Sequence, residues 1–181
     1  MKKTFLLSIL CITAFFTQAQ DSKFDFRFGT GWTFTNSGDD YFIMIENEVN
    51  YKATPYFAFS GSLGFGQNTQ VGATTNTYGS FYQVNTNAYF SPFKNNKQND
   101  FRLGVGLGHI WERSGNYYYS PSPSDQPVLD YAKNNFVANF ILENTYQLND
   151  RFSLGAKIFT QMHDTNNGFH SGAMIKVGYK F

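Results

Sequence analysis

The sequence predicts an all-β protein, an eight-stranded antiparallel up-and-down barrel, on three observations. Eight segments alternate apolar side chains with polar or small ones, which is the period of a half-apolar strand. The connectors between them are alternately short and long. Glycines fall on the polar face of the segments, where a narrow barrel interior needs small residues. The segments are 23–35, 41–52, 56–66, 81–91, 101–113, 135–148, 152–161 and 171–181.

Each segment is justified by its own alternation. The apolar faces of the first four segments contain in turn Phe28, Ile45, Phe59 and Val84. Those of the last four contain Val105, Phe140, Ile158 and Ile175. A length of about 10 residues is what a tilted strand needs to cross a bilayer.

The N-terminus has the pattern of a secretory signal peptide. Lys2 and Lys3 precede the apolar run 5–16, and small residues at Thr17 and Ala19 predict cleavage before Gln20. We therefore expect a removed signal peptide, 1–19, and one barrel domain, 20–181. A lipoprotein anchor at the single cysteine, Cys11, is disfavoured because this residue lies inside the apolar run and follows a bulky leucine.

Composition excludes several classes of function for the mature chain. Removing Lys2 and Lys3 leaves 12 of the 14 basic residues against 13 acidic ones, a net charge of about −1. Nucleic-acid binding is not expected, because it normally requires a basic surface. Without cysteine the mature chain has no disulfide, haem attachment or thiolate metal site, and no cofactor is predicted.

The distribution of aromatic residues favours a transmembrane barrel over a soluble, lipocalin-like one with an apolar interior. Large rings share the apolar face and gather near segment ends, as at Trp32, Trp111 and Phe152. Two aromatic girdles around an aliphatic band are typical of outer-membrane barrels. Lipid is then the partner of the apolar face, and we expect the large rings to point outward and only ionic, polar and small groups to fill the interior.

The connector lengths predict the orientation. The connectors 53–55, 92–99 and 149–151 are short or turn-like, whereas 36–40, 68–79, 114–132 and 162–171 are mostly longer and polar. Short turns face the periplasm in such barrels. Both termini are therefore expected on the periplasmic side.

Several runs resemble a known family. They are Gln18-Ala19-Gln20, the segment from Phe90 through Lys94 to Gly104, the run from Leu148 to Lys157, and the closing Gly178-Tyr179-Lys180-Phe181. The chain resembles the small outer-membrane β-barrel proteins of Bacteroidota, which are similar in architecture to the OmpA and OmpX barrels. The resemblance implies a bacterial outer-membrane location and insertion by the barrel assembly machinery, with Phe181 as part of the assembly signal. It implies no catalytic residues.

Charged residues on the inward face fall at similar depths along the strands. Buried charges persist when they are paired, so we predict an interior ion-pair network in the periplasmic half of the lumen. Its members are Asp25, Arg27, Glu46, Glu48, Arg102, Glu143, Lys157 and Lys176. A gated path for ions or protons is the alternative, and a filled, closed barrel is favoured because water-filled pores generally need many more strands.

Residues with possible chemistry lie near the last connector. His163, Asp164, His170 and Ser171 offer the groups of a hydrolase or acyltransferase, and some eight-stranded barrels modify lipid A. The deacylase type needs an acidic residue downstream, and none lies between Thr165 and Phe181. A metal site at His163, Asp164 and His170 has no support from spacing. We therefore predict neither catalytic nor metal-binding residues.

The loops are the better place for a function. Tyr117, Tyr118 and Tyr119 precede a proline-rich stretch, and tyrosines supply contact area at low entropic cost. They predict contact with an extracellular protein or glycan, or else they extend the aromatic girdle. Asn47 and Asn144 are polar on the apolar face, which indicates either a bulge or a contact with a neighbouring protein.

These observations together predict a non-enzymatic outer-membrane barrel with a structural, surface-contact or adhesion role. A narrow channel for ions or small solutes is the first alternative, and a lipid-modifying enzyme is the second.

Overall fold

The computed structural model describes residues 23–35, 41–71, 75–93, 98–118, 129–164 and 169–181. The expected signal peptide, 1–19, lies outside these residues and stays a prediction. The elements are eight strands: β1 Phe24–Phe34, β2 Tyr41–Lys52, β3 Phe57–Val71, β4 Thr75–Phe90, β5 Asn99–Tyr118, β6 Leu129–Gln147, β7 Phe152–His163 and β8 Phe169–Lys180.

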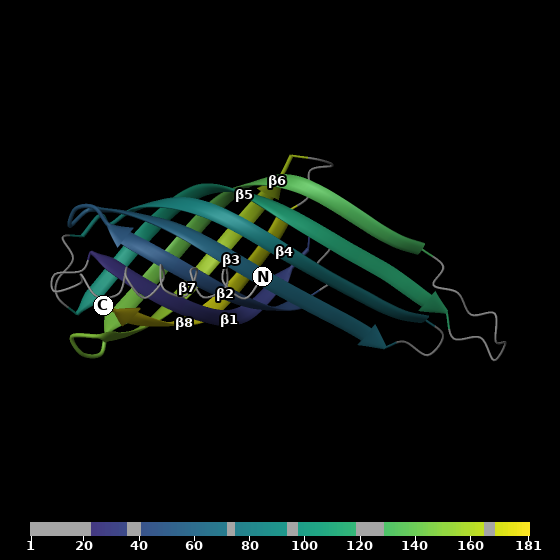
Figure 1. Cartoon of the computed structure of the whole chain (residues 1–181), viewed down its shortest axis with the longest axis horizontal. Helices are drawn as coiled ribbons and strands as arrows, with labels where there is room; N and C mark the ends of the chain where they lie inside the picture. Colours follow the sequence, from purple (N-terminus) through teal and green to yellow (C-terminus); the bar gives the residue numbers. More distant parts are fainter. Residues whose placement is uncertain (1–22, 36–40, 72–74, 94–97, 119–128, 165–168) are drawn as a thin grey trace, which may run out of the picture.

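The strands close into one barrel in sequence order, which confirms the predicted fold (Figure 1). Each strand pairs antiparallel with the next, and β1 pairs with β8. No helix among the described residues is long and apolar enough to cross a membrane.

Asn47 and Asn144 sit in unbroken registers. Asn47 pairs with Phe28 and Leu63, and Asn144 pairs with Phe101 and Ala156, with consecutive partners on either side. Both side chains are exposed. A bulge is therefore excluded as the reason for these polar residues on the outer face.

The two ends of the barrel differ. At one end two of the connections, 53–56 and 148–151, are short, and side chains cap them: Thr54 Oγ1 accepts hydrogen bonds from the backbone amides of Tyr56 and Phe57, and Asn149 Oδ1 does so from those of Arg151 and Phe152. Ser, Thr and Asn favour turns for this reason. At the other end β3, β4, β5 and β6 project past the remaining strands (Figure 1).

The projecting strands correct two expected loop boundaries. Much of 68–79 and 114–132 is strand rather than loop, since β3 pairs with β4 as far as Val71 and Asn76, and β5 pairs with β6 as far as Asn116 and Leu129. The alternation of apolar and polar residues is hard to see in these stretches because Thr, Asn, Gly and Ser dominate them. Such residues can still form strand pairs where they continue an existing hairpin.

The outward face is apolar on every strand. Exposed examples from successive strands are Phe28, Ile45, Phe59, Val84, Leu107, Phe140, Ile158 and Ile175. Leu107 has a relative exposure of 69%. A monomer that exposes large apolar side chains all the way around needs an apolar surrounding.

The prediction that only ionic, polar and small groups fill the interior was wrong. Phe81, Tyr89 and Phe159 are buried inside the barrel together with Met44, Ile110, Val137, Ile141 and Met174. Glycines paired with them on the neighbouring strands make this possible: a Cβ at Gly66 would overlap the ring of Phe81, and a Cβ at Gly172 would lie 2.7 Å from the ring of Phe159. The interior glycines therefore accommodate rings as well as charges.

Candidate functional site

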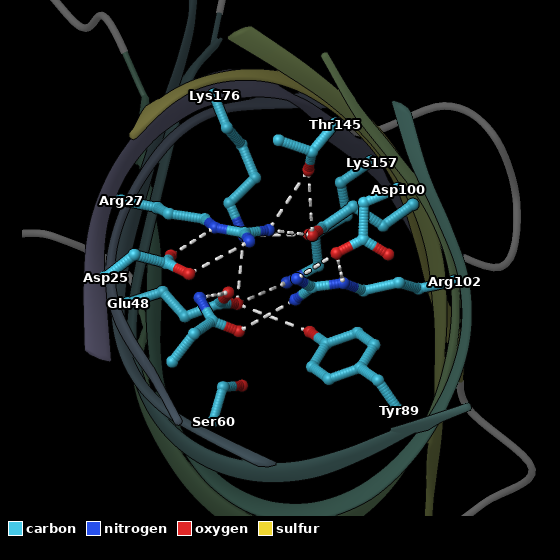
Figure 2. Close-up of polar contacts among 12 residues, drawn as sticks. Asp25, Arg27, Glu48, Ser60, Tyr89, Asp100, Arg102, Thr145, Lys157 and Lys176 are labelled. Carbon is cyan, nitrogen blue, oxygen red and sulfur yellow. Dashed lines mark hydrogen bonds and ion pairs between the residues drawn. The ribbon is translucent and has the colours of Figure 1, made fainter. Parts of the chain in front are cut away.

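The lumen contains a layer of charged side chains near the end with the short connections. The structure places all eight predicted residues on the inward face, and seven of them are buried, with Asp25 partly exposed. Figure 2 shows side chains of this layer converging from opposite walls of the barrel, among them Asp25, Arg27, Glu48, Arg102, Lys157 and Lys176. Period-two alternation brings them to one face, and the register brings them to one depth.

Lys176 on β8 lies at the centre of this layer. Its Nζ is 2.9 Å from Glu48 Oε2, 3.1 Å from Glu143 Oε2 and 3.2 Å from Glu46 Oε1. The side chains of Glu48 and Glu143 have no exposure to solvent. One ammonium group thus joins three carboxylates contributed by β2 and β6, which ties strands on different sides of the barrel together.

Two further cations complete the network. Lys157 Nζ is 2.8 Å from Glu46 Oε1 and 3.8 Å from Glu48 Oε2. Arg27 forms an ion pair with Glu143, and its Nε lies 2.6 Å from Asp25 Oδ1. Each buried carboxylate in this group therefore has at least one cationic partner, which is the condition for burying charge.

Arg102 has a partner that sequence reasoning missed. Its Nε donates to Asp100 Oδ2 at 2.8 Å, and Lys52 Nζ lies 3.8 Å from the same oxygen. Asp100 stands two residues before Arg102 and so shares its face, which is the signal that identifies it. Arg102 reaches the central cluster through Asn50, whose Nδ2 donates to Glu48 Oε1.

Neutral groups add further hydrogen bonds to the charged side chains. The Tyr89 hydroxyl donates to Glu48 Oε2 at 3.3 Å, and Thr145 Oγ1 accepts from Arg27 at 3.1 Å. The guanidinium of Arg102 lies 5.8 Å from the centre of the Tyr89 ring. Chemically the arrangement is a saturated salt-bridge cluster, without an unpaired nucleophile aimed at open space.

An amide layer continues the filling of the lumen. Asn139 Nδ2 donates to Asn87 Oδ1 at 3.0 Å, and Gln161 Nε2 donates to Asn139 Oδ1 at 3.0 Å. A cavity of about 10 Å³ lies between these amides and the Lys157–Glu46 pair. This is room for a single water molecule.

A third group, of two histidines and one glutamate, lies on the inward face toward the end with the projecting strands. His163 on β7 and His170 on β8 have ring centroids 4.7 Å apart, and His170 Nε2 is 3.3 Å from Glu112 Oε1 on β5. Sequence reasoning grouped Asp164 with these histidines, but the Asp164 side chain is exposed. Glu112 takes its place from a distant strand.

The groups of a hydrolase are not assembled among the described residues. Ser171 lies on the opposite face of β8 from His170, and its hydroxyl is 2.9 Å from that of Thr160. His109 faces outward and packs against Trp111 and Phe136.

The predicted contact residues are only partly described. Tyr117 and Tyr118 are the last residues of β5, and Tyr119 lies outside the described residues. Phe181 follows β8, and its ring contacts that of Tyr179.

No model of a known protein family matches the chain, and no curated protein matches its sequence. Solved structures do match. A major outer membrane protein from Thermus thermophilus gives a TM-score of 0.67 at 9% identity over 90% of this chain and 100% of that one.

Two further matches have the same character. Neisserial surface protein A gives a TM-score of 0.63 at 12% identity, covering 88% of this chain and 98% of that one. Ail, the attachment invasion locus protein of Yersinia pestis, gives 0.59 at 12%, covering 87% and 98%. These likenesses show the fold. The barrel is that of small outer-membrane proteins, and at such identities no functional residue is transferred.

Proposed function

We propose that the chain is a bacterial outer-membrane barrel protein. The support is the apolar side chains exposed on every strand, the predicted signal peptide, and a fold shared with surface and outer-membrane proteins. The sequence resemblance to the small barrels of Bacteroidota supports the same compartment. The short connections lie at the periplasmic side with both termini, and the projecting strands lie outside the cell.

The barrel is closed rather than conducting. The observation that carries this is the stack of three fillings: the ion-paired layer around Lys176, the amides around Asn139, and the rings of Phe81 and Phe159. An ion would have to displace buried, paired charges and then pass an apolar layer, both of which cost free energy.

Single-channel recording tests the closed barrel. We expect no conductance above background from the purified protein in a planar bilayer, with a porin as positive control. Discrete conductance steps would support the narrow channel instead and contradict the closed lumen.

The role is non-enzymatic, a surface contact made by the projecting wall of β3, β4, β5 and β6. The pairing of β3 with β2 ends at Gln67 of β3, and the pairing of β6 with β7 ends at Val137 of β6. Within the described residues, Asn68–Val71 and the β6 residues before Asn134 pair on one side only. Exposed strand edges accept extended peptides, and the Tyr117 region adds contact area for a protein or glycan.

Trimming the wall tests this role. Residues 69–78 and 115–130 are each replaced by a two-residue Asn-Gly turn, which joins the paired residues Asn68 and Gly79, and Ser114 and Tyr131. The barrel should still fold, because the residues of the charged layer all lie outside the deleted segments. We expect binding to arrays of immobilised glycans and peptides to fall by at least about tenfold. Equal binding by the trimmed protein and the wild type would refute the contact role.

A further inference from the structure

The charged layer does not use the cluster formed by Glu112, His163 and His170. One carboxylate oxygen and one ring nitrogen from each histidine lie within 4.8 Å of one another. The three residues come from β5, β7 and β8, and all point into the lumen. Nothing in the proposed surface contact or the closed lumen requires them to meet there.

The surroundings hold the two histidines in place. His170 is buried, with a relative exposure of 5%, and its ring lies against Phe42 and Phe81 at centroid distances of 6.2 and 5.7 Å. His163 Nδ1 lies 3.3 Å from Asn135 Nδ2. Exchanging the oxygen and nitrogen of the Asn135 amide lets His163 Nδ1–H donate to the oxygen and leaves the lone pair of His163 Nε2 for a ligand, as in many metal-binding histidines.

The cluster also contains buried polar atoms that the protein leaves unsatisfied. Among the described residues, His163 Nε2 and His170 Nδ1 are buried without a hydrogen-bond partner, and Glu112 Oε1 has its contact with His170 Nε2 at 3.3 Å. A buried polar atom without a partner costs free energy. An ion held by His163 Nε2, His170 Nε2 and Glu112 Oε1 would give His163 Nε2 a partner and would bind Glu112 Oε1.

We propose that Glu112, His163 and His170 form a binding site for a divalent transition-metal ion of the Zn²⁺ class. Two imidazoles and one carboxylate are a known three-residue ligand set for zinc, with the fourth position left open. Imidazole ligands disfavour Ca²⁺ and Mg²⁺, which take oxygen ligands.

The geometry requires only a modest closure. Metal–ligand distances of about 2.0–2.2 Å place tetrahedral donors roughly 3.3–3.6 Å apart, and His170 Nε2 is already 3.3 Å from Glu112 Oε1. The Glu112 side chain is 24% exposed, so it is the flexible member that moves onto the ion. The same exposure gives the ion a way in and leaves the fourth position to water or a small solute.

Metal binding to the purified, untagged protein tests the site, with Co²⁺ and Zn²⁺ as the probes. We expect one Co²⁺ per chain, with the intense visible absorption of tetrahedral cobalt, and its displacement by Zn²⁺. His163→Ala, His170→Ala and Glu112→Gln should each weaken binding by at least about 100-fold. His109→Ala is the matched control, because it removes the remaining one of the 3 histidines from the outer face, and binding should be unchanged.

Folding is separated from ligation by two measurements. Glu112→Gln replaces a partly exposed side chain with one of the same size, so we expect it to fold. If His170→Ala fails to fold, Glu112→Gln therefore still tests whether the carboxylate binds the metal. Zn²⁺ should also raise the unfolding temperature of the wild type and not that of Glu112→Gln. The proposal is overturned if the wild type binds neither ion at about 100 μM, if Glu112→Gln binds as tightly as the wild type, or if His109→Ala abolishes binding.

Discussion

Replacing Lys176 with methionine is expected to remove the centre of the charged layer while keeping its volume. The substitution deletes three contacts of 2.9–3.2 Å to Glu46, Glu48 and Glu143. Removing one partner of a buried ion pair typically costs about 3–5 kcal/mol, because the other charge stays buried without compensation.

The remaining contacts keep the loss within that range. Glu143 retains Arg27, and Glu46 retains Lys157 at 2.8 Å. Glu48 keeps only Lys157 at 3.8 Å as a cationic partner, with Asn50 and Tyr89 as neutral ones. We therefore expect Lys176→Met to lower the free energy of unfolding by about 3–5 kcal/mol.

Equilibrium unfolding in detergent or lipid vesicles measures this loss through the fluorescence of Trp32 and Trp111. Lys180→Met is the matched control, because Lys180 lies on the same strand and is exposed; its effect should stay within about 0.5 kcal/mol. Adding Glu48→Gln to Lys176→Met should recover at least about 1 kcal/mol. Equal stabilities of Lys176→Met and Lys180→Met would refute the account of the lumen.

Three further substitutions probe other parts of the barrel. Gly66→Leu should prevent folding because the leucine side chain would overlap Phe81, whereas Gly61→Ala should not, since no atom lies within 4 Å of its added Cβ. The refolding yields of the two variants measure this difference, and adding Phe81→Ala should restore folding of Gly66→Leu. Tyr89→Phe removes the hydrogen bond to Glu48 and should lower the unfolding free energy by about 1–2 kcal/mol in denaturant titrations. Ile175→Arg, in the middle of β8, should cost about 2–4 kcal/mol in lipid vesicles, and a cost near zero would place this residue outside the apolar band.

The sequence was sufficient for the fold because the relevant pattern is local. Alternation at residues such as Ile43, Ile45 and Val49 identifies a strand and its faces, and antiparallel neighbours follow from short connectors. The same reasoning placed Lys176 and Glu48 on the inward face. It did not show which charges meet, because partners depend on strand register and on side-chain length across the lumen.

Other features depend on information that alternation does not carry. The interior rings of Phe81 and Phe159 were missed because their presence depends on the glycines paired with them on the neighbouring strands, Gly66 and Gly172. Glu112 lies far from His163 in the sequence, so their proximity became evident only in the closed barrel. Asp100 was missed because the predicted segment began one residue after it.

Spin labels on the outer face test whether apolar side chains meet lipid around a sealed interior. The mature chain is expected to lack cysteine, so single cysteines at Val84, Leu107, Phe140, Ile158 and Ile175 can be labelled one at a time. In reconstituted vesicles, all five labels should be accessible to oxygen and shielded from a water-soluble nickel reagent. If the nickel reagent reaches labels on several strands as readily as oxygen does, the outer face meets water and not lipid.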